Sequence, residues 1–173
     1  MAKLFLGLYR FPKPVIAAVN GAAVAGGCGL ATLCDFTLAV PEAKFGYSEV
    51  RIGFLPALVS VFLMRQIPEK HAADLLLTGR LIDAAEALRM GLITEVVPAE
   101  RLMSRARELA ATLSANSPES LARTKRLIRS YGAEEMDTRI ESALQANAAI
   151  RQTADFREGV ASFLEKRPPK WQP

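Results

Sequence analysis

Three glycines at positions 26, 27 and 29, in the stretch "AGGCG", form the first group of residues that could do chemistry. They lie where a β-rich run gives way to helical spacing, and the first turn of a helix offers N–H groups without partners and a positive dipole. Glycine lets a ligand approach such a backbone closely. The cluster lacks the GxGxxG pattern of dinucleotide sites and the GK[ST] of a P-loop. It therefore predicts either an oxyanion hole or a tight corner without a ligand.

Glu49, in "FGYSEVRIG", is the carboxylate whose surroundings favour acid/base chemistry. It stands between an aromatic pair and an apolar run, where burial could raise its pKa toward neutrality. Taken without its context, an exposed surface glutamate is the alternative interpretation.

Other reactive side chains are scarce in this sequence. His71 is the single histidine, which excludes a two-histidine zinc site, and its polar surroundings in "PEKHAAD" predict an exposed structural residue. Cys28 and Cys34 are six positions apart, which fits neither a CxxC redox pair nor half of a zinc site. We interpret both cysteines as small buried hydrophobic residues, and we expect no metal site.

The composition is typical of a globular protein rather than a disordered one. Apolar residues make up 50% of the 173 residues and charged residues 23%. The net charge of +4 is spread along the chain, so we expect no nucleic-acid partner. The apolar runs are broken or too short to cross a membrane, and the first residues lack a signal-peptide cleavage site. These features predict no membrane association and a cytoplasmic location.

The chain divides into two parts at about residue 97. Residues 1–97 alternate β-rich runs, turns and helices; residues 98–173 are helical. In the first part "KPVIAAV" predicts a buried strand, residues 21–29 a turn, "LATLC" the start of a helix and "FTLAV" a second strand. The second part predicts an amphipathic helix with apolar positions at 102, 106, 109, 110 and 113, and two further helices over about 134–151 and 154–166.

Two helix starts have clear capping signals. Asp83 is followed three residues later by Glu86, as in a capping box, and Gly91 stands just past the end of the same helix. Ser117 precedes Pro118, which suits the first helical position because the N–H that proline lacks has no partner there.

Longer stretches of the sequence resemble a known family. "KPVIAAVNGAAVAGGCGLATLCDFTLAVPEAKFGYSEVRIGFLPA" closely resembles the core of the enoyl-CoA hydratase/isomerase, or crotonase, superfamily. "LTGRLIDAAEALRMGLITEVVP" and "DFREGVASFLEKRPPKW" are similar to later segments of that family, in the same order and spacing. The resemblance implies an α/β fold: a spiral of ββα units, partly represented in residues 1–97, followed by a helical region, residues 98–173, that builds trimers, often paired into hexamers.

The resemblance also implies roles for four residues. Gly26 matches the family's oxyanion donor, which receives the thioester oxygen, and Glu49 matches one of two glutamates that work as acid and base. Phe163 and Lys166 match positions that reach the coenzyme A of a neighbouring subunit, the lysine toward phosphate. From the residues alone, Phe163 is a core aromatic and Lys166 a solvated charge. The resemblance implies no cofactor apart from the coenzyme A that is part of the substrate.

The sequence departs from the family pattern at two places near these residues. The family's other glutamate falls at Gly29, and a bulkier "ALVS" at 57–60 replaces the glycine-rich run of many hydratases. One carboxylate fits hydration of branched or carboxylated enoyl-CoA esters, as in some single-glutamate relatives, and it also suffices to move a double bond. The resemblance thus implies hydration of a 2-enoyl-CoA thioester, with enoyl-CoA isomerisation as the alternative.

In the family a second oxyanion N–H, and much of the coenzyme A pocket, come from a segment before "KPVIAAVNG", where this sequence has twelve residues. We therefore consider three possibilities: a fragment of a longer protein, a partner that supplies the missing groups, or a catalytically inactive crotonase-like interaction module.

Overall fold

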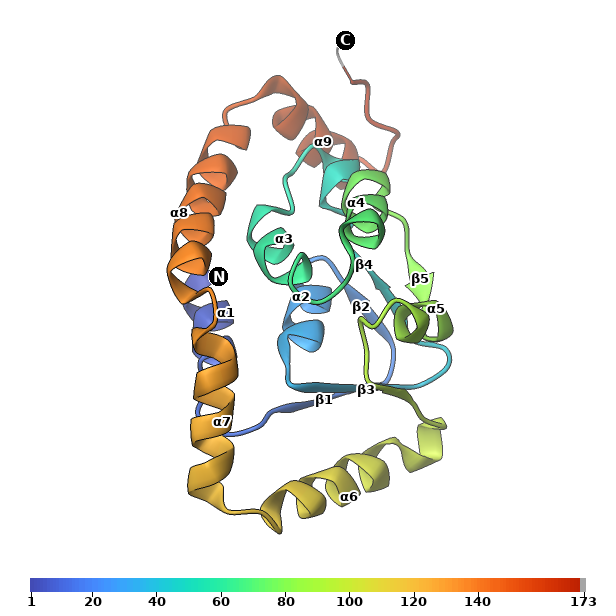
Figure 1. Cartoon of the computed structure of the whole chain (residues 1–173). Coiled ribbons are helices and arrows are strands. Elements are labelled where there is room, and N and C mark those ends of the chain that lie inside the picture. The colour runs from blue at the N-terminus through green and yellow to red at the C-terminus, as the bar shows by residue number, and fades with distance from the viewer. Residues whose placement is uncertain (172–173) are drawn as a thin grey trace.

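The computed structural model describes residues 1–171, which fold into two small sheets surrounded by helices (Figure 1). One sheet has the order β1-β3-β6 and is parallel throughout. Its strands are β1 (Ile16–Val19), β3 (Phe36–Ala39) and β6 (Glu95–Val96). The other sheet has the order β2-β4-β5, with β2 parallel and β5 antiparallel to β4. Its strands are β2 (Ala22–Val24), β4 (Lys44–Gly46) and β5 (Ile82–Asp83).

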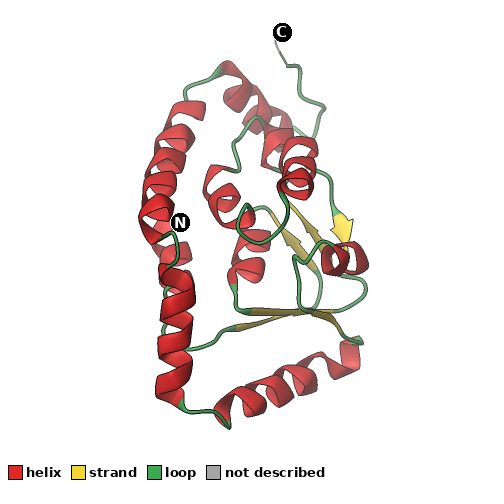
Figure 2. Cartoon of the chain, in the orientation of Figure 1, coloured by secondary structure: helices red, strands yellow, loops and turns green. Residues whose placement is uncertain are grey.

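Helices lie around much of the two sheets, and β5 lies near the right-hand edge of the molecule in this view (Figure 2). In the first part of the chain the helices are α1 (Ala2–Tyr9), α2 (Gly26–Leu33), the 3₁₀ helix η1 (Glu49–Ile52), α3 (Ala57–Leu63), α4 (Glu69–Thr78) and α5 (Ala84–Arg89). In the second part they are the 3₁₀ helix η2 (Ala99–Arg101), α6 (Leu102–Ser114), α7 (Pro118–Ser130), α8 (Ala133–Ile150) and α9 (Ala154–Leu164). Up to residue 171, everything after β6 is helix, turn or loop.

The pairing of β2 with β4 decides where the chain emerges from the second sheet. Because the two strands are parallel and pair Val24 with Gly46, their carboxyl ends lie at the same edge. From that edge β2 leads into α2, and β4 leads into η1. Residues that follow the two strands, although more than 20 positions apart in sequence, therefore start out as neighbours.

The predicted helix caps are confirmed. The Asp83 side chain accepts a hydrogen bond from the N–H of Glu86, and Gly91 has a φ of 79°. The Ser117 side chain accepts from the N–H of Ser120, and Pro118 is the first residue of α7.

Three expectations about local structure are wrong. The predicted turn over 21–29 contains β2, and α2 already begins at Gly26, before "LATLC". The strand predicted as buried, β1, is only partly buried, because β3 covers it from one side alone in the described sheet. The sequence also did not predict α1, an eight-residue helix too short to be stable alone; it forms because Phe5 and Tyr9 are buried against Phe62 of α3.

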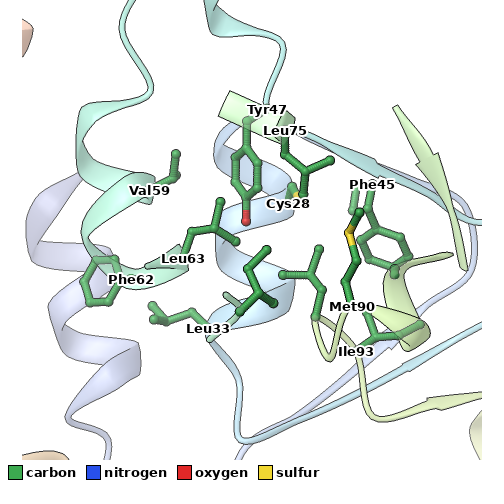
Figure 3. Close-up of a cluster of buried hydrophobic side chains, with 14 of the residues drawn as sticks. Cys28, Leu33, Phe45, Tyr47, Val59, Phe62, Leu63, Leu75, Met90 and Ile93 are labelled. Atoms are coloured by element: carbon green, nitrogen blue, oxygen red, sulfur yellow. The ribbon is translucent and has the colours of Figure 1, made fainter. Parts of the chain in front are cut away.

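The core lies between α2, α3 and the second sheet (Figure 3). Cys28 and Leu33 of α2 face Leu63 of α3, and the Tyr47 ring is fully enclosed. The Tyr47 hydroxyl lies 3.3 Å from the hydroxyl of Thr32, so this buried polar group has a partner. In the predicted stripe of α6, Leu102 is buried, positions 106, 109 and 113 are partly buried, and 110 is exposed.

Two glycines allow α9 to rest directly on η1 and the loop after it. A Cβ on Gly159 would lie 2.1 Å from the carbonyl oxygen of Ile52, and a Cβ on Gly53 would lie 2.3 Å from that of Asp155. Such distances leave no room for a side chain, because the obstructing atoms belong to the backbone. This contact between α9 and η1 fixes the position of η1, the helix to which Glu49 belongs.

We expect Gly159→Ala to lower the free energy of unfolding by about 1–3 kcal/mol, because the added methyl group must push α9 away from η1. Urea denaturation measures the change. The control is Gly7→Ala on the exposed side of α1, where a Cβ meets nothing within 4 Å; it is expected to stabilise by about 0.5–1 kcal/mol, because glycine is the poorer helix former. Equal effects of the two substitutions would contradict the close contact.

Candidate active site

The residue that connects β2 to α2, Ala25, sets the conformation of the backbone at the amino end of α2. Ala25 adopts a φ of 53° and a ψ of −127°, a conformation that is strained for a residue with a side chain. Its N–H donates to the carbonyl oxygen of Gly46 on β4 at 2.8 Å, and its carbonyl oxygen accepts from the N–H of Gly29 at 3.1 Å. The N–H groups of Gly26 and Gly27 thus precede the first hydrogen bond of the helix, where the dipole favours negative charge.

Glu49 is the first residue of η1, and the residue is buried, with 9% of its surface exposed. Its Oε2 is enclosed and has no hydrogen-bond partner among the described residues. Burial raises the pKa of this carboxyl above its ordinary value, because the charged form loses its hydration; a hydrogen bond to the backbone N–H of Glu49 opposes the rise only in part. The carboxyl is therefore suited to hold and release a proton nearer neutral pH.

A cavity of about 530 Å³ brings Gly26 and Glu49 together. Most of its remaining wall is apolar and includes Phe54, Leu55, Ala57, Leu58, Val59 and Leu144. Three of these residues belong to the "ALVS" segment, so the expectation of a bulky apolar wall there is confirmed. In apolar surroundings a backbone N–H interacts more strongly with a developing negative charge than it does in water.

Gly29, the position at which the sequence lacks a second carboxylate, is closed off by side chains. A Cβ there would lie 2.6 Å from Cγ1 of Val59 and 2.8 Å from Cε1 of Phe5. Phe5 is fully buried and Val59 nearly so. The space into which a longer side chain would extend is thus filled by an apolar pair, and Glu49 is the carboxylate of this cavity within residues 1–171.

Phe163 and Lys166 lie elsewhere, at the carboxyl end of α9. Phe163 is 70% exposed, so its interpretation as a core aromatic is wrong. Lys166 is also exposed, as expected for a solvated charge, and has a left-handed φ of 53°. Neither residue lines the cavity that holds Gly26 and Glu49. Within this chain the four predicted site residues form one pair in the cavity and one pair on the surface.

The remaining reactive side chains are placed as expected, with one difference. Cys28 is buried, and burial raises the pKa of its thiol to about 11, whereas Cys34 is only partly buried. His71 is exposed on α4. Among residues 1–171 there is no group of three or more histidine, cysteine or acidic side chains that could hold a metal ion. None of the helices described is long and apolar enough to cross a membrane.

Two polar side chains of the cavity were not predicted from the sequence. Asn147 reaches it from α8, and Arg151 reaches it from the position directly after the end of α8, four residues later. Asn147 continues a stripe of buried residues, Met136, Ile140 and Ala143, at helical spacing. An amide within an apolar stripe was the signal that could have revealed it.

The raised pKa of Glu49 predicts how the protein's stability depends on pH. Between the unfolded pKa, near 4.5, and the higher folded pKa, the folded state keeps a proton that the unfolded state has released. The free energy of unfolding therefore falls as pH rises through that interval, by up to about 1.4 kcal/mol per pH unit from this group.

Glu49→Gln removes this titration, so its stability relative to the native protein should increase from about pH 4.5 upward and then level off. Urea midpoints from pH 4 to 8 measure the difference, with Glu42→Gln as the control that removes a carboxylate from an exposed side chain. A difference between Glu49→Gln and the native protein that does not change with pH would show that Glu49 titrates normally.

Comparisons with known proteins agree with this architecture. The family model described as "Enoyl-CoA hydratase/isomerase" matches residues 1–173. A protein of Thermus thermophilus is 46% identical over 99% of this chain and 68% of its own length. The Escherichia coli 2,3-dehydroadipyl-CoA hydratase is 33% identical over 98% of this chain and 67% of its own. The Mycobacterium tuberculosis enoyl-CoA hydratase EchA19 is 42% identical over 94% of this chain and 62% of its own.

A solved structure is similar over the same part of the chain. The crystal structure of an enoyl-CoA hydratase from Mycobacterium avium has a TM-score of 0.90 at 35% identity, covering 99% of this chain and 67% of that one. The chain thus spans between about three fifths and two thirds of the length of these proteins. The predicted α/β crotonase fold is confirmed, and the chain belongs to the enoyl-CoA hydratase/isomerase family.

Proposed function

We propose that this chain forms the catalytic part of an enzyme that adds water to the double bond of a 2-enoyl-CoA thioester. The observation that carries the proposal is that the N–H end of α2, at Gly26, and the buried carboxyl of Glu49 line one apolar cavity. The relatives named as hydratases of enoyl-CoA and 2,3-dehydroadipyl-CoA support the same class of substrate.

In the proposed mechanism the thioester oxygen accepts a hydrogen bond from the N–H of Gly26. The Glu49 carboxylate takes a proton from water while the water oxygen forms a bond to the third carbon of the acyl group. The electron pair of the double bond moves onto the thioester oxygen, where the N–H of Gly26 stabilises the enolate. Glu49 then returns the proton to the second carbon, and the thioester carbonyl is restored. One carboxyl with a raised pKa serves both proton transfers.

Isomerisation of the double bond is the second candidate, and the packing around Gly29 favours it. Phe5 and Val59 fill the space next to that position, so one carboxylate acts alone in the cavity as described. Glu49 would take a proton from one carbon and return it to another, with the same enolate bound at Gly26. This reaction needs no water, whereas hydration does, so a product analysis distinguishes the two.

We also propose that residues 1–97 form the partial spiral core of the family, and that residues 98–173 form a helical region that assembles the enzyme into trimers or pairs of trimers. The exposed Phe163 and Lys166 at the end of α9 would then contact the coenzyme A bound to a neighbouring subunit, with the ammonium group of Lys166 toward phosphate. Both residues are exposed, and neither lines this chain's own cavity, which supports that assignment.

Glu49→Gln is expected to lower turnover of 2-enoyl-CoA esters by about 10²- to 10⁴-fold, because the amide cannot transfer the proton. The dissociation constant of a saturated acyl-CoA should change little, since the two side chains have the same shape. A hydration assay by loss of enoyl absorbance, together with calorimetric binding, measures both quantities. Glu42→Gln, on the exposed surface, is the matched control. Turnover retained by Glu49→Gln would refute the assignment of Glu49.

A further inference from the structure

The face of α8 that points into the molecule changes character along its length. Met136, Ile140 and Ala143 are buried on this face, and α8 packs there against α3. Asn147 follows at the same helical spacing and Arg151 caps the end of the helix, and both residues line the cavity. The residues of this face are therefore apolar where α8 packs against α3, and two polar side chains follow where the chain lines the cavity.

Asn147 presents an oxygen without a partner. Its Oδ1 is enclosed and accepts no hydrogen bond from the described residues. Leaving such a group buried and unpaired costs about 1–3 kcal/mol, and buried polar groups are nearly always paired. The neighbouring wall residues Leu144 and Ala148 cannot bond to an amide. The oxygen of Asn147 is thus unpaired among residues 1–171, and Asn147 is also one of the residues that line the cavity.

Arg151 adds a positive charge one turn farther along. Its guanidinium carbon lies 5.7 Å from the centre of the Phe54 ring, and within residues 1–171 it forms no ion pair. The arginine is thus held at the cavity by an aromatic face, and its charge is not neutralised by a carboxylate of the described chain. Together the two side chains suit an oxygen-bearing group, which either accepts from or donates to an amide.

We propose that the acyl group of the substrate carries a polar, oxygen-bearing substituent that binds to Asn147. The inference rests on the proposed function: with the thioester at Gly26 and the second and third carbons at Glu49, the rest of the acyl chain extends along the remaining cavity, which α8 lines. A hydroxyl donates to Oδ1 of Asn147. A carboxylate accepts from the amide after a half-turn of its plane, and is also attracted to Arg151.

The test uses three trans-2-enoyl-CoA esters of one chain length that end in a methyl, a hydroxyl or a carboxylate group. The protein should show a higher kcat/KM for a polar ester than for the methyl ester. Asn147→Leu should lower kcat/KM for the preferred polar ester about 10-fold, the value of one hydrogen bond, and leave the methyl ester unchanged or improved. Gln145→Leu makes the same replacement on the exposed side of α8 and should change none of the three.

Arg151→Met distinguishes the two polar groups. It should lower kcat/KM for the carboxylate ester and leave the hydroxyl ester nearly unchanged, because only the carboxylate is charged. Since Asn147→Leu removes an unpaired buried oxygen, we expect this variant to fold at least as stably as the native protein, which thermal unfolding checks.

Calorimetric binding of the three saturated acyl-CoA analogues separates this inference from the proposed function. Absence of turnover with all esters, but tighter binding of a polar analogue that Asn147→Leu abolishes, would refute the proposed reaction and support the polar subsite. Equal or better use of the methyl ester would refute the inference while leaving the hydratase proposal intact. An equal loss for all three esters in Asn147→Leu would place Asn147 against the coenzyme A portion and also refute it.

Discussion

The parallel pairing of β2 with β4 is the constraint on which the candidate site depends. It places Val24 beside Gly46, and the hydrogen bond from Ala25 to Gly46 extends the pairing by one residue past the end of β2. The chain then enters α2 at Gly26 on one strand and η1 at Glu49 on the other. The strained φ of Ala25 makes this sharp change of direction possible. A backbone donor and a carboxyl from different segments thereby share one cavity.

The packing behind these two groups gives them their chemical properties. Phe5 and Val59 occupy the space beside Gly29, while α9 fixes η1 from the other side through Gly159. Glu49 is buried, and the burial that raises the pKa of its carboxyl also strengthens a hydrogen bond from the N–H of Gly26. Stability and reactivity thus have opposite requirements at Glu49. The folded state is more stable when the carboxyl is protonated and neutral, whereas the proposed reaction begins with the charged carboxylate.

Features set by neighbouring residues in the sequence were predictable. The Asp83 and Ser117 caps depend on side chains within three positions, and both form as expected. Gly26 and Glu49 were chosen as site residues because they match a family pattern. The apolar neighbours of Glu49 in the sequence independently predicted burial and a raised pKa, and the structure has both.

Features that depend on tertiary contacts were not predictable. The three-residue β2 exists because β4 lies beside it, and α1 exists because Phe5 and Tyr9 find a place against α3. Phe163 and its neighbour Leu164 are exposed at the carboxyl end of α9, although their residue types suggest a core. Asn147 lines the cavity only because α8 packs beside it, and the sequence does not show that packing.

The most direct test of this account is a crystal structure of the protein with a saturated acyl-CoA bound. We expect the thioester oxygen to lie about 2.7–3.2 Å from the backbone nitrogen of Gly26. The carboxyl of Glu49 should lie beside the second and third carbons of the acyl group. A thioester bound outside this cavity, or one whose oxygen points away from α2, would contradict the pairing of Gly26 with Glu49 as the reacting site.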